Sequence, residues 1–330
     1  MTRTFEPDLL LDVKGLKKYF PIRRGFLQKV IGNVKAVDDV TFFLRQKETF
    51  SLVGESGCGK TTTARCILRA IKPTAGTVLY RSGKGEVLDL AAVSLKDFQG
   101  LRKEMQMIFQ DPFASLNPRM TLLDIVGEPL LVHGEKSSSA RADRVAQLLR
   151  LVGMRPEYMR RYPHAFSGGQ RQRIGIARAL ALNPRLVVAD EPVSALDVSV
   201  QAQILNLMKE LQEEYGMAYL FVSHDLRVIR HVSDQVAIMY LGKILELGPS
   251  EELFRQPSHP YTRSLLSAAP MFGNAPTEHI VLSGDIPSPI APPPGCRFHT
   301  RCFRARKICS EFSPLLREAA PGRFVACHFV

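Results

Sequence analysis

The sequence contains no apolar run long enough to cross a membrane. Its longest apolar segments, such as residues 186–189 and 218–222, are the length of strands, whereas a spanning helix needs about 18 apolar residues. Residues 1–6 lack the apolar segment of a signal peptide. Internal repeats are also absent. The lack of a spanning segment and of a signal peptide predicts a cytoplasmic protein that does not itself span the membrane.

The composition indicates an α/β protein with an anionic partner. A length of 330 residues favours one large domain with a smaller appended unit, and 45% apolar residues are enough to form its core. The formal net charge of +12 suits either nucleic acid or the anionic lipid of a cytoplasmic membrane face. Part of this charge also serves solubility.

A glycine-rich segment at residues 54–61 matches the pattern G-x-x-x-x-G-K-[ST]. It follows an expected strand at 48–53 and precedes an expected helix at 60–71, which is the setting a phosphate-binding loop requires. Backbone N–H groups of such a loop surround phosphate oxygens, and the lysine reaches the terminal phosphates of ATP. The residues expected to bind the nucleotide here are Gly54, Glu55, Ser56, Gly57, Cys58, Gly59, Lys60, Thr61 and Thr62.

A second glycine-rich helix start offers free N–H groups without a second lysine. It consists of Ser167, Gly168, Gly169 and Gln170. Each chain therefore contains two different half-sites. If both grip one nucleotide, the second must come from another subunit, so we expect an obligate dimer.

Alternating strands and helices predict a largely parallel sheet. Strands are expected at 37–44, 186–189 and 218–223, and helices at 122–152, 170–182 and 225–232. Prolines crowd residues 273–295 and mark a linker. We expect a nucleotide-binding domain at 1–255, a proline-rich linker and tail start at 256–295, and a cysteine-rich domain at 296–330.

The order of these motifs, followed by Asp190 and Glu191, resembles the ABC-type ATPases. The resemblance implies a RecA-like core, an antiparallel β subdomain and a helical subdomain. Phosphoryl transfer requires charge neutralisation and a positioned water. We expect Thr61 and Asp190 to hold Mg²⁺ and Glu191 to be the general base.

Further residues match the ABC family residue by residue. Gln110 resembles the glutamine that touches Mg²⁺ and senses the membrane partner, and His224 resembles the switch histidine at the γ-phosphate. Residues 194–197 resemble the D-loop at the dimer interface. Tyr19 fits the aromatic that stacks on adenine, with Phe20 as a rival.

Segments 110–119, 191–199 and 259–262 are similar to the ATPases of oligopeptide and dipeptide importers, specifically the F type that pairs with a distinct D type. The resemblance implies an ATPase coupled to transmembrane transport, peripheral on the cytoplasmic face of the inner membrane. Its partners would be a second ABC ATPase subunit, two permease subunits and an extracytoplasmic solute-binding protein, with no nucleic acid. Nickel or another small solute is an alternative cargo. A soluble ABC ATPase acting on DNA or ribosomes and a redox sensor are alternative functions.

Four cysteines near the C-terminus could bind a metal or cluster. Cys296, Cys302, Cys309 and Cys327 give C-x5-C-x6-C-x17-C in a context where disulfides are disfavoured. Four thiolates suit zinc or an iron–sulfur centre, and the spacing differs from paired C-x2-C knuckles. Residues 291–330 carry seven basic and two acidic residues, a field that favours thiolates. The resemblance implies a 4Fe-4S cluster, with Zn²⁺ second and unliganded cysteines third.

Overall fold

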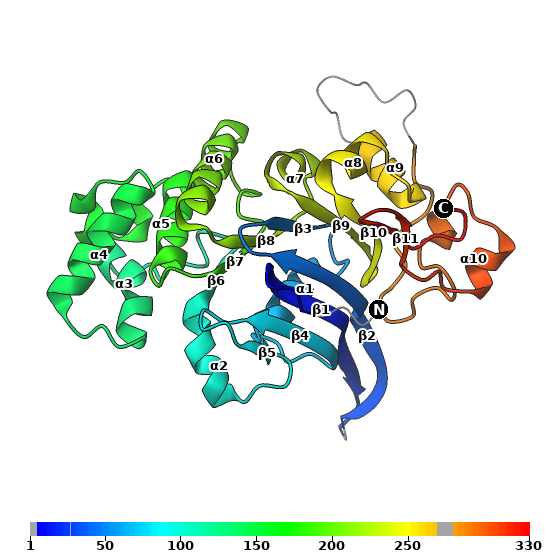
Figure 1. The fold of residues 1–330 in the computed structure, drawn as a ribbon, viewed down its shortest axis with the longest axis horizontal. Helices are drawn as coiled ribbons and strands as arrows, with labels where there is room; N and C mark the ends of the chain where they lie inside the picture. Colours follow the sequence, from blue (N-terminus) through cyan, green and yellow to red (C-terminus); the bar gives the residue numbers. More distant parts are fainter. Residues whose placement is uncertain (1–4, 27, 269–279) are drawn as a thin grey trace.

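The chain folds around two β-sheets, shown in Figure 1, and the computed structural model describes residues 5–26, 28–268 and 280–330. The smaller sheet is antiparallel with the strand order β2-β1-β4-β5. It supplies the antiparallel β subdomain that the sequence predicts. Its strands are β1 (Leu9–Arg24), β2 (Lys29–Arg45), β4 (Ala75–Arg81) and β5 (Val87–Asp89).

The larger sheet has the strand order β11-β12-β10-β9-β3-β8-β7-β6. Neighbours from β9 through β6 run parallel, whereas β10, β12 and β11 pair antiparallel. The predicted parallel sheet is confirmed for those five strands. The eight strands are β3 (Thr49–Val53), β6 (Met105–Ile108), β7 (Leu186–Asp190), β8 (Ala218–Ser223), β9 (Gln235–Tyr240), β10 (Lys243–Pro249), β11 (Arg317–Ala320) and β12 (Arg323–Val325).

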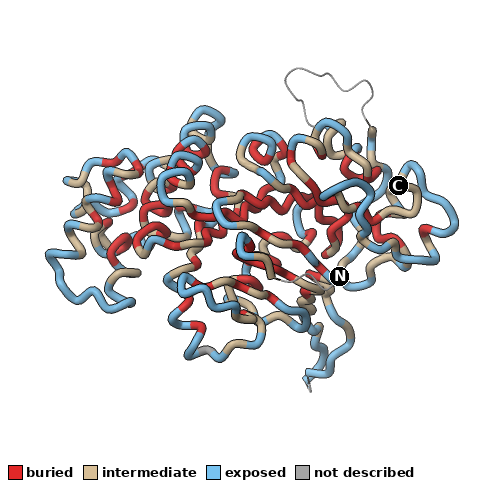
Figure 2. Tube along the Cα trace, viewed as in Figure 1, coloured by how far each residue is buried: buried red, intermediate tan, exposed pale blue. Residues whose placement is uncertain are grey.

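The main sheet separates two hydrophobic cores. Val187 and Ala189 of β7 belong to one core, and Leu186 and Val188 belong to the other. Every residue of β7 is buried, as expected for a central strand covered on both faces. Figure 2 shows this buried band running through the middle of the molecule.

Three helices form a group at the opposite end of the molecule from the C-terminal tail (Figure 1). They are α3 (Leu122–Val132), α4 (Ser138–Leu151) and α5 (Gly168–Leu180). Thr121 and Ser137 cap the first two through their side chains. The single helical stretch expected at 122–152 is therefore two helices, separated by a turn in which Gly134 has φ 103°.

The other helices cover the sheets or lie in the tail. None of the helices within the described residues is long and apolar enough to cross a membrane. They are α1 (Lys60–Ile67), α2 (Leu95–Leu101), α6 (Val198–Tyr215), α7 (Leu226–Val232), α8 (Ser250–Arg255), α9 (Pro260–Ala268) and α10 (Lys307–Glu311), with 3-10 turns η1 (Arg102–Glu104), η2 (Pro156–Arg160), η3 (Pro163–Ala165) and η4 (His299–Arg301).

The cysteine-rich tail is part of the main fold, so a separate cysteine-rich domain is not supported. Strand β12 pairs with β10, with Glu246 opposite Val325. Cys296 and Cys309 belong to the same hydrophobic core as Val187 and Ala189 of β7. The physical reason is that the tail buries its apolar side chains against the ATPase sheet rather than against one another. The expected boundaries at residues 255 and 295 stay a prediction.

Candidate functional site

The phosphate-binding loop connects β3 to α1, as predicted. Close packing leaves room only for glycine at two of its positions: a Cβ on Gly54 would lie 2.2 Å from the Met239 carbonyl oxygen, and one on Gly59 would lie 2.2 Å from that of Ala36. Both glycines also have positive φ angles, 156° and 110°. Neighbouring backbone thus fixes the path of the loop between β3 and α1.

Lys60 is buried at the start of α1, with only 5% of its surface exposed. Its Nζ donates to the carbonyl oxygens of Gly54 at 2.7 Å and Glu55 at 3.1 Å. The loop therefore curls around the ammonium group. This arrangement places the positive charge that would neutralise terminal phosphates inside the loop that binds them.

Two of the three residues predicted to hold Mg²⁺, Thr61 and Asp190, meet directly. The Thr61 hydroxyl donates to Asp190 Oδ1 at 2.8 Å, joining the first turn of α1 to the end of β7. Burial raises the pKa of the Asp190 carboxyl, and the hydrogen bond from Thr61 opposes this effect. A hydroxyl and a carboxylate are oxygen ligands that suit Mg²⁺, which commonly completes its shell with phosphate oxygens and water.

Glu191 lies at the centre of a cluster built from three segments. Its carboxylate accepts from Gln110 Nε2 at 3.0 Å and lies 3.0 Å from His224 Nδ1. The backbone N–H of Glu191 donates to the carbonyl oxygen of Val222. The φ angle of Glu191 is 47°, which is unusual for a residue other than glycine. The structure thus brings together the three residues that the sequence assigned to catalysis, at the carboxyl ends of β6, β7 and β8.

The second glycine-rich motif begins α5. Ser167 Oγ accepts from the N–H of Gln170 at 3.4 Å, and Gln170 Oε1 accepts from the N–H of Ser167 at 3.1 Å, forming a capping box. A Cβ on Gly169 would lie 2.5 Å from Val200, so this glycine allows α5 to approach α6. Ser167 is exposed, which leaves the helix start open to a partner.

Tyr19 and Phe20 have different surroundings. The Tyr19 hydroxyl donates to Asp38, and burial followed by this contact raises the pKa of Tyr19 to about 12. Phe20 is 36% exposed, with Lys18 Nζ 4.9 Å from its ring centroid. The stacking role of Tyr19 on adenine stays a prediction.

The four tail cysteines surround one small cavity of about 20 Å³, together with His299 and His328. The Cys296 N–H donates to the Cys309 carbonyl at 2.7 Å. Burial raises the pKa of the Cys296 thiol to about 11. Within the described residues, no group of three or more His, Cys, Asp or Glu is arranged to hold a metal ion. The structure therefore gathers the cysteines but does not support the predicted 4Fe-4S or Zn²⁺ site.

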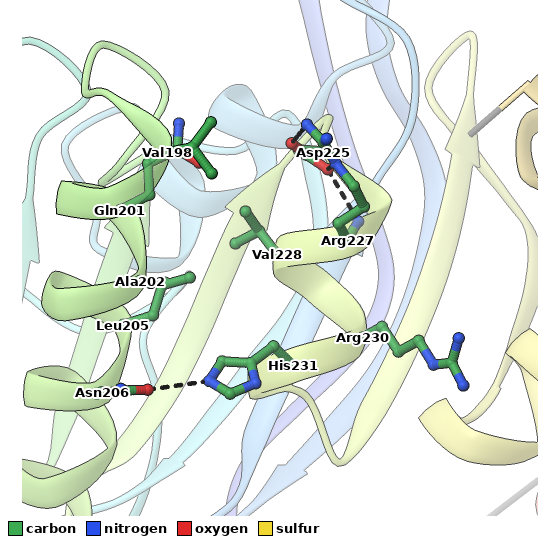
Figure 3. A pocket seen from close by; sticks show the side chains of 10 residues that line it. All are labelled: Val198, Gln201, Ala202, Leu205, Asn206, Asp225, Arg227, Val228, Arg230 and His231. Atoms are coloured by element: carbon green, nitrogen blue, oxygen red, sulfur yellow. Dashed lines mark hydrogen bonds and ion pairs between the residues drawn. The ribbon is translucent and has the colours of Figure 1, made fainter. Parts of the chain in front are cut away.

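A pocket of about 680 Å³ lies between α6 and α7 and contains none of the predicted nucleotide residues (Figure 3). Asp225 pairs with Arg227 at 2.8 Å, and His231 lies 3.2 Å from Asn206 across the pocket. Its wall is otherwise mainly aliphatic. The lining residues are Val198, Gln201, Ala202, Leu205, Asn206, Asp225, Arg227, Val228, Arg230 and His231.

Two tail arginines contact the nucleotide region, and the sequence analysis did not identify either role. Arg301 Nη1 donates to Glu55 Oε2 at 2.8 Å. Arg297 donates to Asp38, the same carboxylate that accepts from Tyr19. No local pattern links residues so distant in the chain. In the sequence, the one sign of these roles was that Arg301 is adjacent to Cys302 and Arg297 is adjacent to Cys296.

Two family models match the chain. The ABC transporter model matches residues 37–194, which include the phosphate-binding loop, Asp190 and Glu191. The model for the oligopeptide/dipeptide transporter C-terminal region matches residues 245–309, which include three of the four tail cysteines.

Similar proteins are known for nearly the whole chain. The oligopeptide transport ATP-binding protein AppF of Bacillus subtilis (strain 168) is 54% identical and covers 97% of both chains. The dipeptide transport ATP-binding protein DppF of Haemophilus influenzae is 47% identical, again with 97% of each chain. A solved dimer of the ATP-binding cassette MJ0796, bound to ADP and phosphate, is 28% identical with a TM-score of 0.63, covering 73% of this chain and 99% of that one. The chain therefore belongs to the ATP-binding proteins of the ABC transporter family, in the group with the oligopeptide/dipeptide transporter C-terminal region.

Proposed function

We propose that this ABC ATPase hydrolyses ATP to energise the import of peptides. The observation that carries the catalytic part is the Glu191 carboxylate, held 3.0 Å from both Gln110 Nε2 and His224 Nδ1. In this role Glu191 accepts a proton from the attacking water while Lys60 neutralises the terminal phosphates. Gln110 and His224 orient the carboxylate, and His224 reaches the γ-phosphate.

Thr61, Asp190 and Gln110 would hold Mg²⁺. The bond from Thr61 to Asp190 supports this assignment, because both oxygens already converge at one point. Bound Mg²⁺ would offset negative charge on the phosphates. Asp190 acts as a carboxylate in this role, so burial that raises its pKa must be outweighed by the cation and by Lys60.

The exposed start of α5 would complete a nucleotide site on another subunit. Gly168 and Gly169 present N–H groups but no lysine nearby in sequence, whereas the phosphate-binding loop presents both. Each half-site therefore needs its counterpart. The partner would be a second ABC ATPase subunit, and the resemblance to the F type favours a heterodimer.

Peptide transport rests on the names of the relatives and on the C-terminal match. We infer two permease subunits and an extracytoplasmic solute-binding protein as the other components, with this chain peripheral on the cytoplasmic face of the inner membrane. The C-terminal match favours this function over a soluble ATPase that acts on nucleic acid.

A 4Fe-4S cluster bound by Cys296, Cys302, Cys309 and Cys327 is a further part of the proposal. All four side chains face one cavity, and four thiolates are the ordinary ligand set of such a cluster. Zn²⁺ is the alternative occupant. The bound group would supply a structural link among three separate parts of the tail.

Co-expression with the second ABC ATPase subunit and the two permease subunits tests the assignment of function. The complex should be recovered from detergent-solubilised membranes and, in proteoliposomes with the solute-binding protein, should take up labelled peptide only when ATP is supplied. Lys60→Ala is the control that removes the phosphate contact. Uptake that is independent of Lys60, or failure to associate with any membrane subunit, would contradict the proposal.

A further inference from the structure

We propose that Arg301 and Arg297 are positioning residues through which the cysteine-rich tail sets the geometry of the nucleotide site. The proposal rests on the ATPase function and adds a regulatory role for the tail. Arg301 reaches the phosphate-binding loop, and Arg297 reaches the carboxylate that holds Tyr19. The two arginines thus contact both ends of the predicted ATP site.

The contact between Arg301 and Glu55 is shielded from water. The Arg301 side chain is 9% exposed and that of Glu55 is 23% exposed. The Arg301 guanidinium also lies 5.9 Å from the ring centroid of Tyr240. An ion pair in such surroundings is weakly screened, and removing one partner leaves the other charge without compensation.

Glu55 links Arg301 to Lys60, the lysine of the phosphate-binding loop. Its carbonyl oxygen accepts from Lys60 Nζ at 3.1 Å, while its carboxylate accepts from Arg301. Its backbone N–H donates to the Tyr261 hydroxyl at 3.2 Å. Two residues C-terminal to the ABC transporter match therefore hold the loop residue whose carbonyl helps place Lys60.

Arg297 makes the corresponding contact on the other side of the site. It is buried and donates to the Leu241 carbonyl and to Asp38 Oδ2. Asp38 Oδ1 accepts from the Tyr19 hydroxyl. The Tyr19 side chain is thus fixed through an acceptor that the tail itself holds in place.

The order of the tail determines where both arginines lie. Arg297 follows Cys296 directly, and Arg301 precedes Cys302. Between them, the Phe298 ring packs 5.4 Å from Tyr240 and 5.1 Å from Tyr261, measured between centroids. Any event that loosens the cysteine cavity would therefore move side chains that contact the nucleotide site.

The test compares Arg301→Gln, Glu55→Gln and the double variant in the complete transporter complex. Each single change should raise the KM for ATP by roughly tenfold, the size expected for loss of one charged hydrogen bond, with a smaller change in kcat. The double variant should be no worse than either single one, since both remove the same contact. The KM for ATP of Arg301→Lys should lie between those of the parent protein and Arg301→Gln.

Lys307→Gln is the matched control, because it removes a positive charge from the same tail at an exposed position outside these contacts and outside the cysteine cavity. It should leave the KM unchanged. Hydrogen exchange of residues 54–60 should become faster in Arg301→Gln and stay as in the parent protein in Lys307→Gln. If Arg301→Gln does not fold, Glu55→Gln tests the same ion pair from the loop side.

The outcomes separate this inference from the ATPase function. If Lys60→Ala abolishes ATP hydrolysis while Arg301→Gln and Glu55→Gln both match the Lys307→Gln control, the positioning role is wrong and the ATPase assignment stands. If Lys60→Ala retains hydrolysis, the assignment of the nucleotide site itself fails. Additive losses in the double variant would also overturn the proposal, because they would show that the two side chains act independently.

Discussion

The carboxylate of Glu191 lies 3.0 Å from Nδ1 of His224, and the two residues follow neighbouring strands of the main sheet, β7 and β8. Glu191 also accepts from Gln110 at the end of β6. Parallel strands direct their carboxyl ends toward one edge of a sheet, where ligands of α/β proteins commonly bind. The position of the catalytic cluster is therefore a consequence of the sheet topology.

Thr61→Ala should weaken the use of Mg²⁺. The change removes the hydroxyl that donates to Asp190 at 2.8 Å and that we assign to the metal. We expect the Mg²⁺ concentration for half-maximal ATPase activity to rise by about tenfold or more. Thr61→Ser retains the hydroxyl and should behave almost as the parent protein. Equal Mg²⁺ dependence in the alanine and serine variants would argue against this ligand.

Ser167→Arg should block hydrolysis at the site built on the partner's phosphate-binding loop. A bulky cation at the start of α5 would fill the space expected for the γ-phosphate. ATP binding to this subunit's own Lys60 site should persist, as measured with a fluorescent nucleotide. Ser137→Arg is the control, because Ser137 caps α4 in the same way. Loss of nucleotide binding to the isolated Ser167→Arg subunit would place the motif within its own chain's site.

Asp38→Asn should reduce stability in a manner that depends on pH. Burial acts to raise the pKa of Asp38, but the contacts with Tyr19 and Arg297 outweigh it and lower the pKa below its usual value of 3.8. The charged carboxylate thus stabilises the fold above about pH 4, and this contribution disappears as the pH falls through the folded pKa. The cost at pH 7 should be about 1–3 kcal/mol.

Urea denaturation from pH 7 downward measures this effect. The difference between the parent protein and Asp38→Asn should stay constant to about pH 5 and then shrink on further acidification. A difference that grows as the pH falls would contradict the sign of the pKa shift. A difference near zero at pH 7 would show that the buried pair with Arg297 contributes little net stability.

Cys302→Ser should loosen the tail first, and it should weaken nucleotide binding only as far as Arg301 and Arg297 lose their positions. The cysteines lie outside the phosphate-binding loop and line one cavity, where a bound metal or cluster would join separate parts of the tail. Protein purified without oxygen should be brown and contain about four irons per chain if a cubane cluster is bound. Stoichiometric zinc without iron would favour Zn²⁺, the alternative to the cluster. If the protein contains neither iron nor zinc, the thiols are unliganded.

Much of the central site could be predicted because its signals are local. The glycine-rich loop, the apolar strand ending at Asp190 and the capped helix at Ser167 each occupy a few consecutive residues. Strand β8 was predicted with its observed bounds, since Tyr219, Phe221 and Val222 have high β propensity within a short apolar run. Local patterns of this kind depend little on the rest of the fold.

The placement of the tail could not be predicted in the same way. Strand β11 is exposed along its length, and its neighbour β12 has three residues, so neither shows a periodic pattern. The pairing of β12 with β10, and the ion pair between Arg301 and Glu55, join residues far apart in the chain. Such contacts arise only when the core is assembled. A composition rich in cysteine and arginine indicated a metal-binding unit but not what it packs against.

The most direct test of the account is the rate of ATP hydrolysis by Glu191→Gln in a complex whose other ATPase subunit has been inactivated. The amide keeps the shape of the side chain but cannot accept the proton of the attacking water, so turnover should fall by about 10²–10⁴-fold while ATP still binds. Glu210→Gln, an exposed change of the same kind on α6, should have no effect. Near-normal turnover by Glu191→Gln would contradict the central claim.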